Sequence, residues 1–263
     1  MSYGTPSFSG PPPAYSPVST AGPSTHNEPR DFDQIPDDFT HKVHVSVSEC
    51  DDGVQKAFIR KVYSILFAQL SLSTLIAGVM MYNVNFSSWF EHHSWTSFVA
   101  FLVSLVFLFL LMWKRRSYPL NYVFLTGFTL AESYTVGAIV ALSDREIVLQ
   151  ALILTTGIFI GLTLFTSQSK YDFSGMAPYL FGGLCVVVVA GIVGIFFPFG
   201  KTMDLIIAIG TAILFCGYII YDTSNLMNRL SPEEYITASL ELYLDFVNLF
   251  IAILRILNDL NRD

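Results

Sequence analysis

Seven apolar runs of about 20 residues alternate with short polar stretches along the chain after residue 53. An α-helix of that length crosses the hydrocarbon core of a bilayer, which is about 30 Å thick. Because the connections are short, we expect helices that follow one another in sequence to pack as antiparallel neighbours. In the fourth run, Gly157 and Gly161 form a GxxxG motif, which is typical of a helix face that packs closely against another helix. The expected spans cover residues 62–83, 95–113, 121–142, 147–166, 177–197, 204–225 and 235–257.

The composition agrees with an all-α, polytopic membrane protein. Of the 263 residues, 52% are hydrophobic and 13% charged, and the mean hydropathy is +0.53, which excludes an ordinary soluble domain. The net charge of −7 gives no basic surface for nucleic acid, so we expect no nucleic-acid partner. Three cysteines are too few for a disulfide framework, and the chain has no His/Cys cluster or phosphate-binding loop. We therefore expect no bound cofactor.

Residues 1–53 form a tail rich in Pro, Ser, Thr and acidic residues. Such a composition buries too little apolar surface to fold alone, so we expect a disordered tail followed by a membrane domain over residues 54–263. Within the tail, Pro12-Pro13-Ala14-Tyr15 matches the PPxY pattern that WW domains bind as a polyproline-II segment. The motif predicts a WW-domain partner such as a ubiquitin ligase, and the alternative is a solvated linker.

Two carboxylates interrupt the last two apolar runs, Asp222 in one and Asp245 in the other. Between them, Ser231-Pro232-Glu233-Glu234 is typical of a helix start, with Ser231 as N-cap and Glu234 completing a capping box. Asp222 lies about 11 residues before this turn and Asp245 about 12 after it, which is about 17 Å from the turn in each case. An antiparallel hairpin would therefore place the two carboxylates side by side, where they would titrate as a unit.

Further polar residues share helix faces with these two aspartates. A carboxylate in hydrocarbon costs about 2.5–3.5 kcal/mol, so such faces should meet protein or water rather than lipid. Hard cations such as calcium prefer oxygen ligands, so a narrow path lined by acids suits cation permeation or proton sensing. The alternative is that the acids serve only helix packing, each satisfied by a polar neighbour. The residues on these faces are Glu241, Asp245, Asn248, Ala252 and Arg255 in the last run and Tyr218, Asp222, Asn225 and Arg229 in the run before it, with Glu132 as a further acid in the third.

A basic cluster, Lys114-Arg115-Arg116, ends the second run. A guanidinium there could reach a carboxylate of the last hairpin one or two turns deeper in the membrane. The alternative is that the cluster only anchors the helix by the positive-inside rule.

The distribution of Lys and Arg predicts that the tail faces the cytosol. Seven spans would then send the C-terminus across the membrane, whereas six spans with a re-entrant last segment would return it; seven is preferred because the last run is long enough to span. The expected cytosolic positions are Lys56, Arg60, Lys61, Lys114, Arg115, Arg116, Lys170 and Arg229, against Arg145 and Lys201 in the opposite loops.

Three stretches of the chain resemble a known family. Tyr221-Asp222-Thr223, the nine residues from Leu242 to Phe250, and Phe128-Thr129-Leu130-Ala131-Glu132 are similar to the transmembrane Bax inhibitor motif proteins, and most of all to their lifeguard branch. The resemblance covers about residues 55–260, and the Pro-rich tail with its PPxY motif is also similar to the lifeguard branch.

The resemblance implies a seven-helix fold with a central last helix and a pH-sensitive calcium leak that protects against cell death. It implies that Asp222 and Asp245 are the family's paired aspartates, which sense pH and control opening. The same two carboxylates are the expected contacts of a permeant calcium ion. Arg115 matches a basic residue that hydrogen-bonds to the closed pair, with Arg116 one register away. Glu132, Glu241 and Asn248 are expected to support the polar path. The expected partners are lipid, permeant calcium and cell-death regulators. The expected membrane is the endoplasmic reticulum, with vacuole or Golgi as alternatives.

Two other functions remain open from the sequence. An intramembrane aspartyl protease also pairs two membrane aspartates, but it requires glycines before the second one, where this chain has Leu242-Tyr243-Leu244. We therefore expect no enzyme. A non-conducting regulator that acts through partners of the tail is the other alternative, and a proton-coupled exchanger cannot be separated from a channel.

Overall fold

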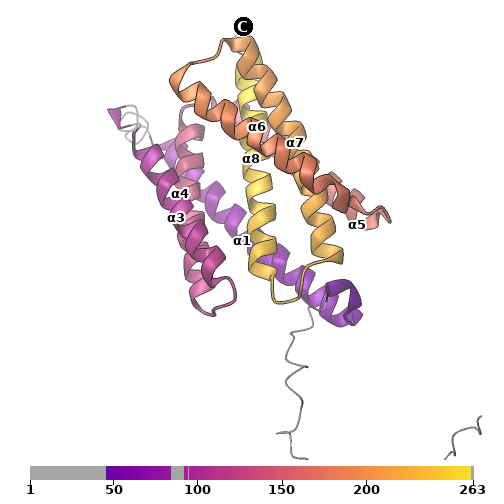
Figure 1. Ribbon diagram of the computed structural model, residues 1–263. Coiled ribbons are helices and arrows are strands. Elements are labelled where there is room, and N and C mark those ends of the chain that lie inside the picture. The colour runs from indigo at the N-terminus through magenta and orange to yellow at the C-terminus, as the bar shows by residue number, and fades with distance from the viewer. Residues whose placement is uncertain (1–45, 84–91, 94, 262–263) are drawn as a thin grey trace, which may run out of the picture. The chain divides into compact units, whose positions relative to one another are not determined.

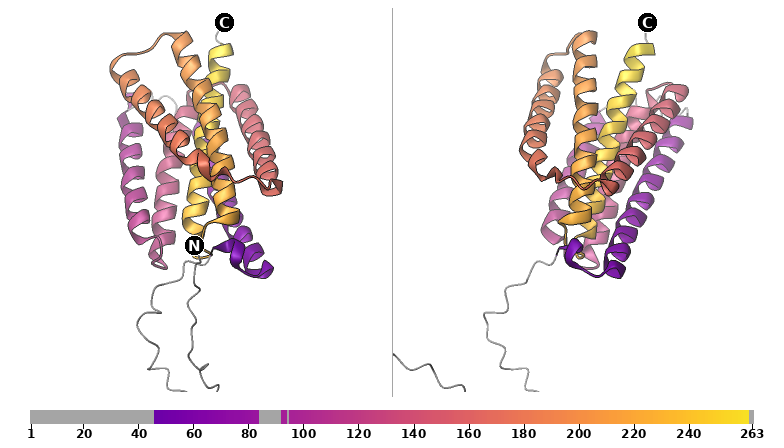
Figure 2. Two further views of the ribbon diagram at one scale, coloured as in Figure 1. Left: turned by 45° about the vertical axis from the view of Figure 1, so that its right-hand side comes forward. Right: turned by 90° about the vertical axis from the view of Figure 1, so that its right-hand side faces the viewer.

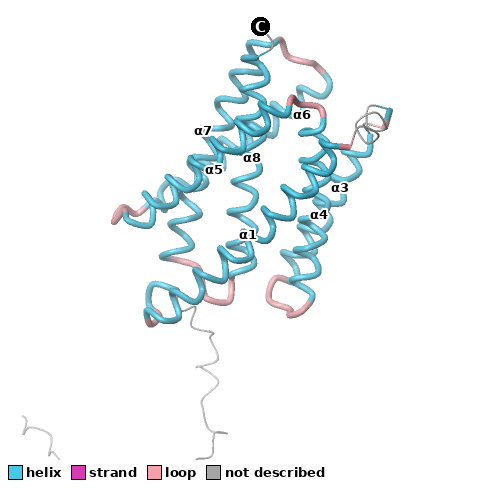
Figure 3. The backbone as a smooth tube through the Cα atoms, turned by 180° about the vertical axis from the view of Figure 1, so that it is seen from behind, coloured by secondary structure: helices cyan, strands magenta, loops and turns pink. Residues whose placement is uncertain are grey.

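The computed structural model describes residues 46–83, 92–93 and 95–261, and every element in these ranges is helical (Figures 1 and 3). The all-α prediction is therefore confirmed, while the tail segment 1–45 with its PPxY motif lies outside the described residues. The elements are η3 (Val47–Glu49), α1 (Asp52–Tyr82), α3 (Trp95–Lys114), α4 (Leu120–Ala141), α5 (Arg145–Gln168), η4 (Phe173–Met176), α6 (Ala177–Phe196), α7 (Lys201–Asn228) and α8 (Tyr235–Asn261).

The last helix, α8, occupies the centre of the bundle, as the resemblance implies. It packs against α1, α4, α5 and α7, and it runs the length of the bundle between them (Figures 1 and 2). Tyr243, Leu249 and Leu254 have no exposed surface. Six helices in the described ranges are long and apolar enough to cross a membrane, and α8, which carries the polar stripe, is the seventh α-helix of these ranges. Its 27 residues span about 40 Å, enough to cross while enclosed by protein.

The position of α8 overturns the expectation that neighbours in sequence pack together throughout. The pairs α3–α4, α6–α7 and α7–α8 do pack as predicted. The other large contacts join helices that are not neighbours in the chain, namely α1 with α4, α1 with α8, α5 with α7 and α5 with α8. The apolar faces of α1, α4 and α5 are buried against the central helix, which none of them follows in sequence.

The two ends of the described chain lie at opposite ends of the bundle (Figure 2). Near the start, the amide of Val47 donates to the carbonyl of Leu230 in the α7–α8 turn, whereas α8 ends at the far side. A re-entrant α8 would return to its starting side, so this placement agrees with seven crossings.

Folded structure begins earlier than the predicted boundary at residue 53. The η3 segment is ordered, and α1 begins at Asp52 rather than near residue 62. The first turns of α1 are amphipathic, because Phe58 and Val62 are buried on one face while charged residues occupy the other. A search for apolar runs passes over such a stretch.

The predicted GxxxG face is not a helix contact within the described chain. A Cβ added at Gly157 or Gly161 would meet no other atom within 4 Å. Close approach occurs instead at Gly127 of α4, where an added Cβ would lie 2.6–2.9 Å from ring atoms of Phe107 on α3. The motif is present as a sequence pattern, but within the described residues it faces open space.

We predict that Gly127→Leu lowers the thermal stability of the purified protein in detergent, because the new side chain overlaps the Phe107 ring and separates α3 from α4. Gly157→Leu is the matched control, since it makes the same change on an open helix face and improves helix propensity. Equal melting temperatures for both variants would contradict the α3–α4 packing described above.

Candidate functional site

The carboxyl groups of Asp222 on α7 and Asp245 on α8 contact each other at hydrogen-bonding range inside the bundle. The matching depths counted from the turn thus bring the two residues together as expected. Asp245 is only 3% exposed, and its Oδ2 atom has no hydrogen-bond partner within the described residues. Two carboxyl groups can hydrogen-bond only if one of them carries a proton, so a contact at this range suits a pair that shares one.

Polar neighbours on α7 complete the surroundings of the pair. Asn225 contacts the Asp222 carboxyl. Tyr218 lies one turn before Asp222, within electrostatic range of both aspartates. These positions belong to the polar face that the sequence assigns to this helix. The polar faces of α7 and α8 therefore meet each other inside the bundle.

Glu241 lies one turn before Asp245 on α8, within electrostatic range of Asp222, Glu234 and Arg115. It connects the pair to the charged turn at the end of the hairpin. Glu132 does not join this group, because its side chain contacts Ser104 of α3. The structure thus places Glu241 beside the aspartates and Glu132 on the other side of α8, in the α3–α4 interface.

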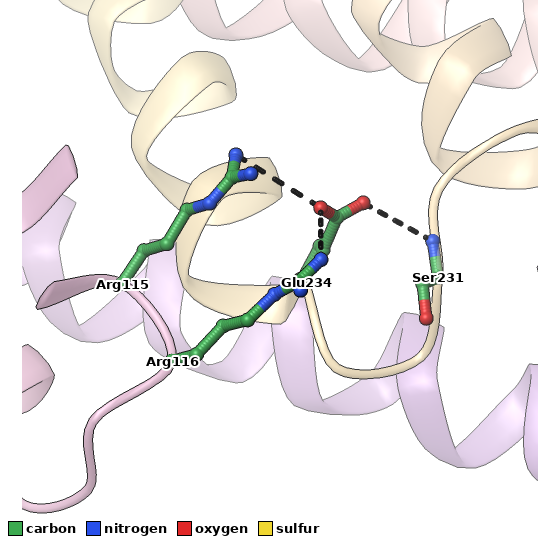
Figure 4. A network of polar contacts seen from close by, with 4 residues as sticks. All are labelled: Arg115, Arg116, Ser231 and Glu234. Atoms are coloured by element: carbon green, nitrogen blue, oxygen red, sulfur yellow. Dashed lines mark hydrogen bonds and ion pairs between the residues drawn. The ribbon is translucent and has the colours of Figure 1, made fainter. Parts of the chain in front are cut away.

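Arg115 and Arg116 form ion pairs with Glu234 rather than with the aspartates (Figure 4). The nitrogen–oxygen distances are 3.9 Å from Arg115 and 3.4 Å from Arg116 to the same Oε1 atom. This arrangement corrects the expected hydrogen bond from Arg115 to the closed pair. Both arginines sit in the α3–α4 connection, so they attach that connection to the α7–α8 turn.

Glu234 is the residue of this site that sequence reasoning missed. It was assigned to a capping box, and its Oε2 atom does accept from the amide of Ser231 at 3.4 Å, although α8 begins only at Tyr235. Its other oxygen binds the arginines, and the side chain is 9% exposed. The signal was available, because Glu234 lies seven residues before Glu241 and therefore extends the polar stripe by two turns.

A buried hydrogen-bond network fixes the opposite face of α8. The hydroxyl of Ser73 on α1 contacts those of Ser133 on α4 and Tyr243 on α8, at 2.7 and 2.8 Å. Tyr243 also packs edge-on against Phe128, with ring centroids 6.1 Å apart. These bonds join α1, α4 and α8 through the Ser73 hydroxyl. They fix the rotation of α8 about its axis, and this rotation points Asp245 toward Asp222.

A cavity of about 480 Å³ begins one turn beyond the pair and continues toward the C-terminal end of α8. Asn248 lines it near the pair, and Asp204 and Arg255 line it at the far end, where they form an ion pair at 3.8 Å. The remaining wall is mostly small or apolar and comes from α6, the α6–α7 connection, α7 and α8, for example Gly191, Phe199 and Ala208. Asn248 and Arg255 therefore face a space, as the stripe predicts, rather than lipid.

The described residues contain no group of three or more His, Cys, Asp or Glu side chains that could hold a metal ion. The pair offers two carboxyl groups, with Asn248 as a further oxygen ligand nearby. Such a set suits brief contact with a hard cation rather than storage of one.

Comparison with known proteins gives one family. Residues 55–262 match the family described as "Inhibitor of apoptosis-promoting Bax1". The chain is 41% identical over 252 residues to Bax inhibitor 1 of Schizosaccharomyces pombe, covering 96% of this chain and 91% of that protein. It is 44% identical over 229 residues to mouse Protein lifeguard 4, covering 87% and 94%. It is 39% identical over 228 residues to the Golgi anti-apoptotic protein of vaccinia virus (strain Lister), covering 87% and 95%.

The family match covers the whole described helical bundle from α1 to α8, including the hairpin that carries the paired aspartates. This chain therefore belongs to the Bax inhibitor-1 and lifeguard family of membrane proteins.

Proposed function

We propose that this protein regulates cell death from an intracellular membrane and that it does so as a pH-sensitive, calcium-permeable leak controlled by Asp222 and Asp245. The names of its relatives support the first part, since they include a Bax inhibitor and a Golgi anti-apoptotic protein. The contact between two carboxyl groups inside the bundle carries the second part, because it joins a proton-sensitive group to a line of cation-binding oxygens.

The pair forms the seal of the proposed path. While it holds one proton, a hydrogen bond keeps α7 and α8 together at this level. Loss of that proton leaves two negative charges in contact, and at about 4 Å these repel by about 4 kcal/mol at the effective dielectric of protein sites. Proton binding then shifts the equilibrium between sealed and open forms by the difference in proton affinity between them.

Charged groups lead to the seal from the turn side of the bundle. Glu241 precedes Asp245 by one turn of α8, and Glu234 lies seven residues before Glu241, in the turn just before the helix. Acidic side chains in this order attract cations toward the pair. The two arginines bound to Glu234 neutralise the first step of the line while the α3–α4 connection stays attached.

The cavity beyond the pair provides the opposite half of the path. It starts at Asn248 and ends at the ion pair of Asp204 and Arg255, both of which are partly exposed. A cation that passes the aspartates would thus enter a mostly apolar space in which Asn248, Thr211 and Asp204 supply side-chain oxygens. Only the short segment around the aspartates has to open.

A cytosolic tail is the orientation that we propose for the bundle. The tail junction, the α3–α4 connection and the α7–α8 turn meet at one end, as the contacts of Val47 and of the two arginines with that turn demonstrate. Lys61 adds a further cation there, 3.3 Å from the centre of the Tyr235 ring. A cluster of positive residues at one end of a membrane bundle faces the cytosol. The endoplasmic reticulum or the Golgi is the proposed membrane.

The protease alternative fits the geometry poorly. Leu242 and Tyr243 precede Asp245, are at most 1% exposed, and form part of the core against Phe128. A peptide substrate would need the space that these side chains fill. A regulator that acts through a WW-domain partner of Tyr15 remains compatible with a leak, and calcium flux through the purified protein separates the two.

We predict that purified protein in liposomes with an enclosed calcium dye gives a calcium leak whose rate changes with pH. Asp222→Asn and Asp245→Asn should each flatten that pH dependence, because an amide cannot gain or lose the shared proton. Asp144→Asn is the matched control, since it makes the same change at the exposed N-cap of α5, where Asn caps equally well. A folded wild-type protein that gives no leak at any pH would contradict the proposal.

We also predict that Gly191→Phe slows the leak several-fold, because the new ring enters the cavity beyond the aspartates. A Cβ at Gly191 would meet no atom within 4 Å, so the backbone need not move. Gly182→Phe is the control on the same helix, with equally open surroundings but outside the cavity. Equal leak rates in the two variants would remove the cavity from the path.

A further inference from the structure

The segment Ser46–Cys50 is held on the end of the hairpin that carries the paired aspartates. The hydroxyls of Ser46 and Ser48 both donate to the main-chain carbonyl of Asn228, at 2.5 and 3.0 Å. Between them, the amide of Val47 donates to the carbonyl of Leu230 at 2.9 Å, and the Val47 side chain is completely buried. We call this segment the serine clip.

The serine clip caps the C-terminal end of α7. Asn228 is the last residue of that helix, and carbonyls at this position have no partner within the helix and carry partial negative charge. Two hydroxyl donors from a distant part of the chain satisfy one of them. Asn228 lies six residues after Asp222, about 9 Å along the helix, so the clip holds the end of the helix that contributes half of the pair.

We propose that Ser48 is a phosphorylation site and that a phosphoryl group on it releases the serine clip from the α7–α8 turn. A protein kinase transfers the γ-phosphoryl group of ATP to the Ser48 Oγ atom. The new bond joins Oγ to phosphorus, the bond between the γ-phosphorus and the bridging oxygen of ATP breaks to leave ADP, and the kinase base takes the hydroxyl proton. The modified oxygen no longer has a hydrogen to donate to Asn228.

Exposure and neighbouring charge single out Ser48 rather than Ser46. Ser48 is exposed, whereas Ser46 is half-buried and its Oγ also caps η3 by accepting from the amide of Ser48. Acids follow Ser48 at the first, third and fourth positions, as Glu49, Asp51 and Asp52. Such an acidic stretch suits kinases that recognise acids after the target serine. The cytosolic orientation proposed above places this hydroxyl on the side where ATP-dependent kinases act.

The local charges also give the direction of the effect. A phosphate adds about −1.5 to −2 charges. At a helix C-terminus or beside acidic residues, it is repelled by the partial negative charge of the carbonyls and by the carboxylates. Both conditions hold for Ser48, which faces the end of α7 and precedes three acids. Arg229 is the adjacent cation on the hairpin. It lies within electrostatic range of Asp172, the residue that precedes η4. The pKa of Asp172 is held below its usual range, chiefly by hydrogen bonds from Ser174, so this carboxylate stays negatively charged near Arg229.

Cys50 provides a built-in reporter for release of the clip. It is half-buried, and its Sγ atom contacts the carbonyl of Ser46 at 3.5 Å. The other two cysteines, Cys185 and Cys216, lie in the membrane-spanning parts of α6 and α7, where a membrane-impermeant maleimide does not reach them. The labelling rate of the full chain in lipid nanodiscs therefore measures exposure of the clip and needs no calcium flux.

The experiment treats the full chain with an acid-directed serine kinase and ATP, maps the phosphate by mass spectrometry, and measures maleimide labelling of Cys50. We expect phosphate on Ser48 and labelling about tenfold faster, the scale set by the loss of one or two hydrogen bonds. Phosphatase treatment should restore the slow rate, and Ser48→Ala incubated with kinase and ATP should show no acceleration beyond its own starting rate. A Ser48 that stays unmodified, or modified protein that labels no faster, would overturn the proposal.

The consequence for the paired aspartates rests on the proposed function, and the readouts keep the two apart. Calcium leak is measured on the same phosphorylated and unphosphorylated samples. Faster Cys50 labelling establishes the clip even if no sample conducts calcium, in which case the leak proposal fails alone. A leak that responds to phosphate on Ser48 while Cys50 labelling stays slow would contradict release of the clip.

Discussion

Two carboxyl groups in the middle of a membrane protein impose the constraint on which the rest of this fold depends. Each would cost several kcal/mol against lipid, so both must face protein, and each must meet a polar partner. Asp222 and Asp245 satisfy the condition through each other. A helix that presents such a group on one face can be enclosed by its neighbours, and α8 accordingly lies at the centre with α1, α4, α5 and α7 around it.

The two faces of α8 differ in their contacts: one is hydrogen-bonded to neighbouring helices, and the other carries the acidic side chains. One face binds α1 and α4 through Tyr243, Ser73 and Ser133, and these hydrogen bonds set the rotation of the helix. The other face carries a line of acids and an amide from Glu234 to Asn248, which continues into the cavity beside α6. Because hydrogen bonds hold the first face to α1 and α4, the proposed response to a change of charge on the second face is a movement of α7 or of the α7–α8 turn. Both the arginine contacts and the serine clip attach to that turn.

Much of this arrangement can be predicted from the sequence, because apolar runs and turn signals are local features. The described helix bounds differ from the predicted spans by a few residues, except at the start of α1. Counting from the turn was enough to place the aspartates side by side. Contacts between distant segments were not predictable in this way: nothing local pairs Arg115 with Glu234, turns Gly157 outward, or brings Ser48 to the end of α7. The roles of the aspartates and of the polar path stay predictions.

The central claim is that Asp222 and Asp245 act as one proton-sharing unit, and infrared difference spectroscopy of the reconstituted protein tests it most directly. The carbonyl band of a protonated carboxylic acid is followed as the pH is changed, in wild type and in each single Asp→Asn variant. A shared proton predicts that either substitution removes or shifts the same band. If each substitution left the titration of the remaining aspartate unchanged, the two groups would be independent, and the account of a paired seal would be wrong.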